Sequence, residues 1–178
     1  MKSAKRQVRA GRIAAAVITL AGCAAATHAA SADTTRIEAA RALMTRVRYC
    51  ALITIGDDGQ PQARTMDPAP PDARMVVWLV TNPATRKVKQ IERDPRVTLY
   101  YFDVRSPGYV TLVGTAKIVR DPAARQKRWV KKWTPFYPGG AAGAILIEVT
   151  PRRIEVIDVA RGIAGDPKSW LPPSVDFK

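Results

Sequence analysis

The residues with the clearest chemical potential lie where an apolar strand pattern gives way to a helix pattern. Thr81 ends the apolar run, and the first turn of the following helix would contain Thr85, Arg86 and Lys87. A helix start offers free N–H groups and a partial positive charge, so it favours an anion. An Arg guanidinium and a Lys ammonium add the charge that binds phosphate. The segment therefore predicts a phosphate site, and a solvated helix start with ordinary surface cations is the alternative interpretation.

The elements that would position this segment belong to a single α+β domain in which strands dominate. Apolar residues recur at helical spacing in residues 33–47, and Asn82-Pro83 is a typical opening for the helix that carries the two cations. A third, basic helix is expected over residues 122–133. Apolar alternation or continuous apolar runs predict strands, over residues 50–55, 60–66, 75–80, 96–103, 109–120, 144–150 and 152–159. Their short antiparallel links favour a barrel or closed sheet with helices at its ends.

The N-terminal 32 residues are predicted to be a targeting signal rather than part of this domain. Residues 1–12 contain five basic residues and no acidic residue, and an almost wholly apolar run follows over residues 13–26. This arrangement is typical of a secretory signal peptide. Two cleavage interpretations stay open. Leu-Ala-Gly-Cys, ending at Cys23, resembles a lipobox, with Cys23 as a lipid attachment site ahead of a short Ala-rich tether. Ala-Ser-Ala, ending at Ala32, fits an ordinary signal peptidase site.

The formal charge of +14 raises the question of nucleic-acid binding. We expect no nucleic-acid partner, because part of the charge lies in the leader and an exported protein meets little nucleic acid. Five further cations lie on the predicted helix of residues 122–133, which would be solvated or would contact an anionic membrane surface. One His and two Cys leave no plausible structural zinc site, so no metal is expected.

Further short motifs accompany the predicted phosphate segment in a fixed order. They are Gln62-Ala-Arg64-Thr-Met66, Thr81-Asn82-x-x-Thr85-Arg86-Lys87-x-x-Gln90, Tyr100-Tyr101-Phe102, Tyr109-Val-Thr-Leu-Val-Gly-Thr-Ala116, Trp133-x-x-x-Tyr137-Pro-Gly-Gly140 and Val149-Thr-Pro-Arg-Arg-Ile-Glu155. From about residue 36 to residue 158 this set resembles the pyridoxamine 5′-phosphate oxidase-like, FMN-binding split-barrel family, and more closely its general stress protein 26-type branch. The resemblance implies a six-stranded antiparallel split β-barrel over residues 33–160, followed by a C-terminal tail of residues 161–178.

The resemblance also implies a homodimer that binds FMN in a groove at the dimer interface, with FAD or a deazaflavin as the less favoured cofactor. The residues that would hold the phosphate and ribityl chain are Arg64, Thr81, Arg86 and Lys87. Those that would present backbone and apolar contacts to the isoalloxazine ring are Thr65, Met66, Leu79 and Val80. Two aromatic residues would cover the flavin, with core packing as their alternative role: Trp133 and Tyr137.

The sequence departs from the family at two positions that concern the substrate. True pyridoxamine-phosphate oxidases carry a C-terminal Arg-x-His element, but residues 161–178 contain no His, and Tyr109 stands where those enzymes have a flavin-contacting Gln. We therefore expect an exported, periplasmic FMN-dependent oxidoreductase that does not use pyridoxamine phosphate. The alternative is a module that carries or senses a flavin or another small anion at the membrane surface without turnover. No residue is assigned as catalytic.

Overall fold

The computed structural model describes the backbone of residues 18–178 and the side chains of residues 31–178. Residues 1–17 of the predicted leader and the side chain of Cys23 lie outside the described part. The helices are α1 (Ile18–Arg46), α2 (Arg86–Arg93) and α3 (Pro122–Arg128), with the short 3₁₀ segments η1 (Lys131–Phe136), η2 (Gly140–Gly143) and η3 (Val159–Arg161). The strands are β1 (Cys50–Ile55), β2 (Pro61–Met66), β3 (Val77–Thr81), β4 (Arg96–Asp103), β5 (Gly108–Val119), β6 (Ile145–Asp158) and β7 (Ser174–Asp176).

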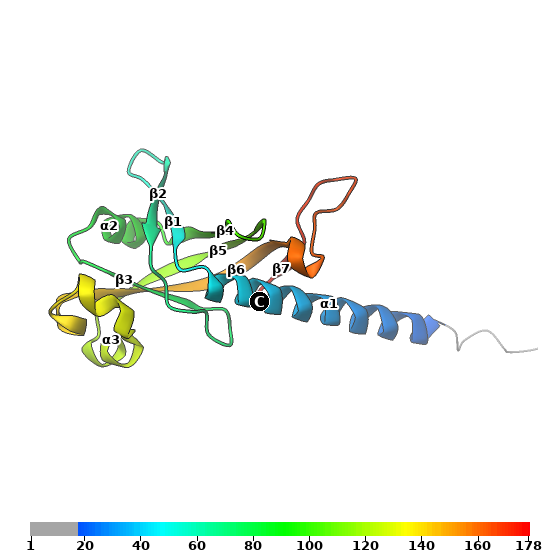
Figure 1. The fold of residues 1–178 in the computed structure, drawn as a ribbon, viewed down its shortest axis with the longest axis horizontal. Helices are drawn as coiled ribbons and strands as arrows, with labels where there is room; N and C mark the ends of the chain where they lie inside the picture. Colours follow the sequence, from blue (N-terminus) through cyan, green and yellow to red (C-terminus); the bar gives the residue numbers. More distant parts are fainter. Residues whose placement is uncertain (1–17) are drawn as a thin grey trace, which may run out of the picture.

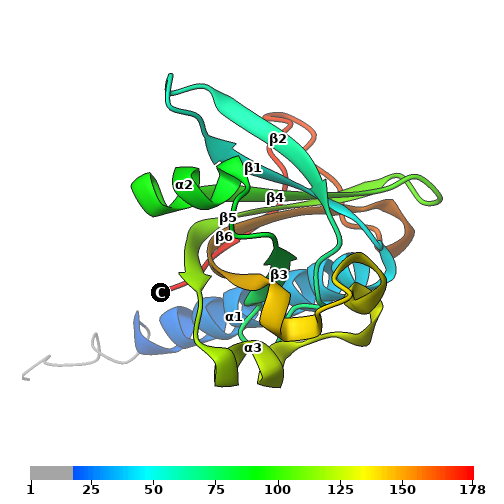
Figure 2. The ribbon, with the colours of Figure 1, turned by 90° about the vertical axis from the view of Figure 1, so that its left-hand side faces the viewer.

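Six strands form a curled antiparallel sheet in the order β2-β1-β4-β5-β6-β3, and β7 adds to β6 outside this path (Figure 1). Figure 1 shows α2 and α3 at the end of the molecule where β2 and β3 lie, and Figure 2 looks onto this end. This α+β architecture is the split barrel that the motifs predicted. The sheet path begins at β2 and ends at β3, so the two strands that carry most predicted ligand residues are its two terminal strands.

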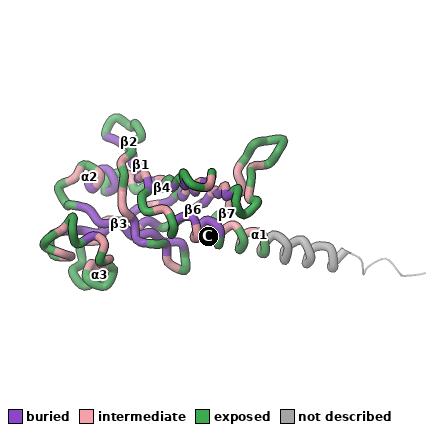
Figure 3. The backbone as a smooth tube through the Cα atoms, viewed as in Figure 1, coloured by how far each residue is buried: buried purple, intermediate pink, exposed green. Residues whose placement is uncertain are grey.

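Strand alternation and one helix face build the main core, which Figure 3 shows as buried segments. In β1, Cys50, Leu52 and Thr54 face inward, while the intervening residues are only partly buried. α1 covers this core with Ala39, Ala40, Leu43 and Met44. β3 is buried on both faces, because Val77 and Leu79 pack in the main core while Trp78 and Val80 pack in a second cluster around Trp133.

α1 begins well before the helix that the sequence predicted over residues 33–47. Its backbone is helical from Ile18, because an Ala-rich stretch has high helix propensity and no Pro interrupts it. Among the side chains that the structure describes, the first fully buried ones on α1 are Ala39 and Ala40. No helix of the described residues has both the length and the hydrophobicity to cross a membrane.

The prediction of two final strands separated by Pro151 is wrong, because β6 runs unbroken through this residue. The register of β5 against β6 shifts between Val113, which faces Arg153, and Gly114, which faces Pro151, so β6 bulges at Arg152 directly next to Pro151. A bulge tolerates the missing N–H of Pro. Gly114 is required here, since a Cβ atom on it would lie 2.2 Å from the carbonyl oxygen of Thr150.

Three further elements differ from the sequence prediction, and the bounds of β2, β3, β5 and β6 shift by one or two residues. α2 begins at Arg86 rather than at Asn82, because Asn82 forms a turn in which its Oδ1 accepts a hydrogen bond from Ala84 N at 2.8 Å. The helix expected over residues 122–133 ends at Arg128, and the chain then turns to bury Trp133. Residues beyond 160 are not merely a tail, since β7 pairs with β6 and buries Val175.

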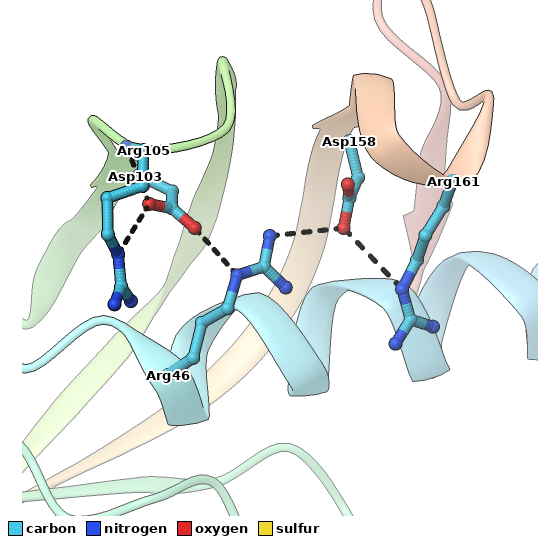
Figure 4. A network of polar contacts seen from close by, with 5 residues as sticks. All are labelled: Arg46, Asp103, Arg105, Asp158 and Arg161. Atoms are coloured by element: carbon cyan, nitrogen blue, oxygen red, sulfur yellow. Dashed lines mark hydrogen bonds and ion pairs between the residues drawn. The ribbon is translucent and has the colours of Figure 1, made fainter.

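An ion-pair network joins α1 to the far ends of two strands, β4 and β6 (Figure 4). Arg46 Nε donates to Asp103 Oδ2 at 2.6 Å, and Arg46 Nη2 donates to Asp158 Oδ2 at 3.3 Å. Both carboxylates are buried, and Arg105 and Arg161 approach them from the solvent side. Hydrogen bonding to Arg46 is the largest cause that lowers the pKa of Asp103. Arg46 therefore links α1 to β4 and β6. Because both carboxylates are buried, water cannot easily take the place of Arg46 as their partner.

We predict that Arg46→Met lowers the thermal midpoint by several degrees at pH 7, because two buried carboxylates lose their shared cation. A carboxyl whose pKa is lowered in the folded state adds stability above its unfolded pKa, and this contribution disappears as the pH falls through the lowered value. The difference between wild type and variant should therefore shrink below about pH 4. Thermal unfolding from pH 3 to pH 7 measures this.

Arg36→Met is the matched control, because Arg36 lies on the same helix and, among the described residues, forms its ion pair with the partly exposed Asp33. Its thermal midpoint should stay close to that of the wild type. Equal stability of the Arg46 variant and the wild type at pH 7 would contradict the role of the network.

Candidate functional site

Three cations from two elements gather at the edge of the sheet. Arg64 projects from β2, and Arg86 and Lys87 begin α2 directly after β3. Lys87 Nζ donates to Thr81 Oγ1 at 3.1 Å, and the hydroxyls of Thr81 and Thr85 lie 3.1 Å apart. The structure thus brings together the four residues that were predicted to hold a phosphate and ribityl chain.

These cations raise each other's electrostatic free energy. Burial is the main cause that lowers the pKa of Arg64, and the charge of Arg86 adds to it. Burial, and then the charge of Arg64, lower the pKa of Lys87. Within residues 31–178, no carboxylate forms an ion pair with any of the three. A partly buried cluster of like charges without counterions is suited to an anionic ligand.

The start of α2 adds hydrogen-bond donors to this cluster. Thr85 is the N-cap residue, but its side chain makes no capping bond and instead donates to the carbonyl of Asn82 at 2.9 Å. The side chain of Thr85 therefore caps none of the first-turn N–H groups, although its backbone carbonyl accepts a hydrogen bond from Val88 N at 3.0 Å. The positive end of the helix faces the same region as Arg86 and Lys87, which the helix macrodipole disfavours unless an anion lies between them.

A buried polar network that the sequence analysis did not identify holds Arg64 in place. Its members come from β1, β2 and α2: Thr54, Gln62 and Gln90. The available signals were a Thr at an inward position of the apolar strand 50–55 and a Gln between Val88 and Ile91 on the inner helix face. Neither signal shows which partners the two side chains have.

An aromatic cleft of about 270 Å³ lies beside the cations. Five of the predicted ligand residues line it, namely Thr65, Met66, Val80, Trp133 and Tyr137, together with Tyr49, Asp67 and Phe136. The cleft is therefore built from the end of β2, the face of β3 that is turned away from the barrel core, and η1. The consecutive residues Arg64-Thr65-Met66 and Val80-Thr81 connect it to the cation cluster.

The two predicted covering aromatics combine packing with a place at the cleft. Trp133 is fully buried, and its Nε1 donates to the carbonyl of Asp67 at 2.8 Å. Trp129 contacts both Trp133 and Tyr137 edge to face. Tyr137 is only half-buried, and burial raises its pKa. Trp133 thus forms a fixed wall of the cleft, whereas Tyr137 presents its ring at the opening.

Leu79 differs from the other predicted ring contacts. Its side chain is fully buried in the main core, on the face of β3 opposite to the cleft. Only the backbone of Leu79 could contact a ligand there, so a side-chain contact from this residue is ruled out.

The basic segment around α3 is largely occupied by contacts within the chain. Arg125 donates to the carbonyls of Ala142 and Ala144, Arg128 stacks over the ring of Trp78, and Lys132 pairs with Asp67. These contacts favour the interpretation of a packed, solvated surface over a membrane-binding one.

Cys50 adds no nucleophile to the site, and the described side chains offer no metal centre. Burial raises the pKa of Cys50 to about 12, so this thiol is not a nucleophile near neutral pH. Among the described side chains, no cluster of three or more His, Cys, Asp or Glu residues could hold a metal ion.

Comparison with known proteins identifies the family. The family model described as pyridoxamine 5′-phosphate oxidase matches residues 37–158. The chain belongs to this family. The match confirms the family that the ordered motifs indicated and covers most of the split barrel. Among curated proteins, none matches this chain in sequence.

Several solved structures share the fold of this family member. A protein related to general stress protein 26, from Clostridium acetobutylicum, is 22% identical with a TM-score of 0.65, and the match covers 82% of this chain and 95% of that one. An F420 reductase is 26% identical with a TM-score of 0.53, covering 64% of this chain and 94% of the reductase. A pyridoxamine 5′-phosphate oxidase-related, FMN-binding protein from Nostoc punctiforme is 17% identical with a TM-score of 0.55, covering 83% and 95%.

Proposed function

We propose that this protein binds FMN and is an oxidoreductase that uses it. The observation that carries the proposal is the arrangement of an uncompensated cation cluster directly beside an aromatic cleft, in a member of the pyridoxamine 5′-phosphate oxidase family. Two similar structures are described as an FMN-binding protein and an F420 reductase, which supports a flavin-type ligand.

The residues fit both halves of FMN. A phosphate would accept hydrogen bonds from Arg64, Arg86 and Lys87. It would also offset the two causes that lower the pKa values of Arg64 and Lys87, which are burial first and then the charge of a neighbouring cation. A flat ring system would lie along Thr65 and Met66, against Val80 and the aromatic residues of η1. The separation of charge and aromatic surface within one site matches a ligand that is anionic at one end and apolar at the other.

A bound flavin supplies hydride transfer at its N5 atom. The protein's own contribution is to hold the phosphate at the start of α2, to orient the ring against β2 and β3, and to exclude water with Trp133 and Tyr137. None of the side chains lining the cleft is a His, Lys or Glu, and Asp67 is paired with Lys132 at 2.5 Å. We therefore assign no general acid or base. Without a C-terminal His, we propose a substrate other than pyridoxamine phosphate.

We predict that Lys87→Ala weakens FMN binding about tenfold, equivalent to about 1.4 kcal/mol, because the phosphate loses a charged donor. Riboflavin has no phosphate, so its affinity should change little. Lys117→Ala removes an exposed Lys on β5 and should leave both affinities unchanged. Quenching of flavin fluorescence measures all three proteins, and equal FMN affinity in the Lys87 variant and the wild type would remove Lys87 from the phosphate site.

Reduction of the bound FMN distinguishes an enzyme from a carrier. Bleaching of the FMN-loaded protein by NADPH or another hydride donor supports turnover. A protein that binds FMN but that no donor reduces supports the carrier alternative, and preference for a deazaflavin or FAD over FMN would correct the cofactor.

We propose that the protein works as a homodimer that covers the cleft. The outer face of the sheet exposes large apolar side chains, with Tyr100, Phe102 and Val113 between 38% and 51% exposed. Thr65, Ala51 and Tyr100 lie in register across β2, β1 and β4, so this apolar face continues directly to the cleft. A second copy on this face would bury the apolar surface and close the cleft at the same time.

Phe102→Glu should convert the dimer into a monomer and weaken FMN binding, because a carboxylate would enter the apolar interface. We expect the dimer dissociation constant to rise by about tenfold or more. Val104→Glu adds the same charge at a residue of the β4–β5 turn that is 79% exposed, and it should leave the dimer intact. Light scattering coupled to size-exclusion chromatography measures both variants; a wild-type monomer contradicts the proposal.

We propose that the protein is exported and lipid-anchored in the periplasm through Cys23. The basic leader, its apolar run and the lipobox-like sequence support this. Cleavage before Cys23 or after Ala32 would leave the buried part of α1 intact, since its fully buried side chains begin at Ala39.

Mass spectrometry of the protein purified from its own cells should find a mature chain that begins at a lipid-modified Cys23. An unmodified chain beginning at Asp33 would refute the anchor while supporting export. A chain that retains residues 1–22 would refute export itself.

A further inference from the structure

We propose that Gln90 is a positioning residue that makes the site selective for flavins that carry a phosphate. Its buried, uncharged amide holds Arg64 in place without neutralising it. This inference rests on the proposed function, because it concerns the same phosphate site. The amide of Gln90 would keep the positive charge of Arg64 available to the phosphate of a ligand.

Gln90 connects three elements through one side chain. Its Oε1 accepts hydrogen bonds from Thr54 Oγ1 at 2.6 Å and from Arg64 Nη2 at 3.0 Å, and its Nε2 donates to Gln62 Oε1 at 2.8 Å. The residue is 4% exposed. Both the carbonyl and the amino group of the amide therefore have partners, so this orientation is strongly preferred.

Every acceptor that holds Arg64 is neutral. Besides Gln90, Arg64 Nη1 donates to Thr54 Oγ1 at 2.6 Å and to the carbonyl of Leu52 at 3.3 Å. Arg46 provides the contrast within the same chain, because its guanidinium is held by the carboxylates of Asp103 and Asp158. Hydrogen bonds to neutral acceptors therefore hold Arg64 in place, while its positive charge stays uncompensated.

Gln90 also sets the position of Arg64 relative to the other two cations. It lies three residues after Lys87 and four after Arg86, so one face of α2 carries the two cations and the amide. The hydrogen bond from Arg64 to Gln90 therefore holds a strand cation beside two helix cations that repel it. Without this bond, Arg64 would still donate from Nη1 to Thr54 and Leu52, but repulsion would turn its Nη2 away from Arg86 and Lys87 until a ligand arrived.

Gln90→Glu separates charge from geometry. A Glu side chain has the same length and shape, and it keeps an oxygen that accepts from Thr54 and Arg64. It also places a negative charge against Arg64, which compensates the cation and repels a phosphate. Gln126→Glu is the control for the substitution itself, because it makes the same change at an exposed residue of α3, outside this network.

The experiment measures FMN and riboflavin affinities of the full-length protein and its variants by fluorescence quenching. We expect Gln90→Glu to weaken FMN binding about tenfold or more and to change riboflavin binding less than about twofold. Gln126→Glu should change FMN binding by less than about twofold. In an Arg64→Met background, Gln90→Glu should lose most of its effect, because the two residues act through one contact.

A second readout needs no flavin. At constant ionic strength, inorganic phosphate should raise the thermal midpoint of the flavin-free wild type and raise that of Gln90→Glu less. If Gln90→Glu does not fold, Gln90→Met keeps the side chain neutral and releases Arg64; it should weaken FMN binding and spare riboflavin binding.

The outcomes separate this inference from the proposed function. A wild type that binds neither FMN nor riboflavin refutes the proposed function. A wild type that binds FMN, with Gln90→Glu binding it equally well, refutes only the role of Gln90. Equal losses of FMN and riboflavin affinity, or an undiminished effect in the Arg64→Met background, would mean that Gln90 supports the fold without setting phosphate selectivity.

Discussion

The site depends on the curl of the sheet, because the curl brings its two terminal strands, β2 and β3, to the same end of the molecule. β3 is covered on both faces, by the barrel core on one side and by the cluster around Trp133 on the other. This double cover determines where the chain leaves β3 at Thr81 and enters α2. Arg86 and Lys87 therefore come close to Arg64 of β2 although the backbones of the two elements do not pair. The cleft lies at the same place, between the end of β2, β3 and η1.

The molecule contains two groups of charged residues with different roles. In one group, Arg46 connects α1 to β4 and β6, and two buried carboxylates compensate its charge. At the other, Arg64, Arg86 and Lys87 lie together without any carboxylate partner among the described side chains. The first arrangement stabilises the empty protein. The second destabilises it until an anion binds, which is typical of a functional site.

Local sequence patterns predicted most elements because strand alternation and helix periodicity are properties of neighbouring residues. The errors occurred where a distant contact overrode the local signal. Pro151 did not end a strand because it lies at a bulge opposite Gly114. The basic helix stopped at Arg128 because burial of Trp133 required a turn. The segment after residue 160 contributed β7 because β6 offered a free edge, which no local pattern reveals.

The order of residue types along the chain was enough to indicate the family, the split-barrel class and the residues of the predicted phosphate site. How those residues work together depends on the tertiary structure. It placed Thr65, Met66, Val80, Trp133 and Tyr137 around one cleft and turned the side chain of Leu79 away from it. It also revealed that Thr54 and Gln90 hold Arg64, and that Gln62 accepts a hydrogen bond from Gln90. The hydrogen bond between Thr54 and Gln90 joins residues 36 positions apart, so only the folded chain brings the two together.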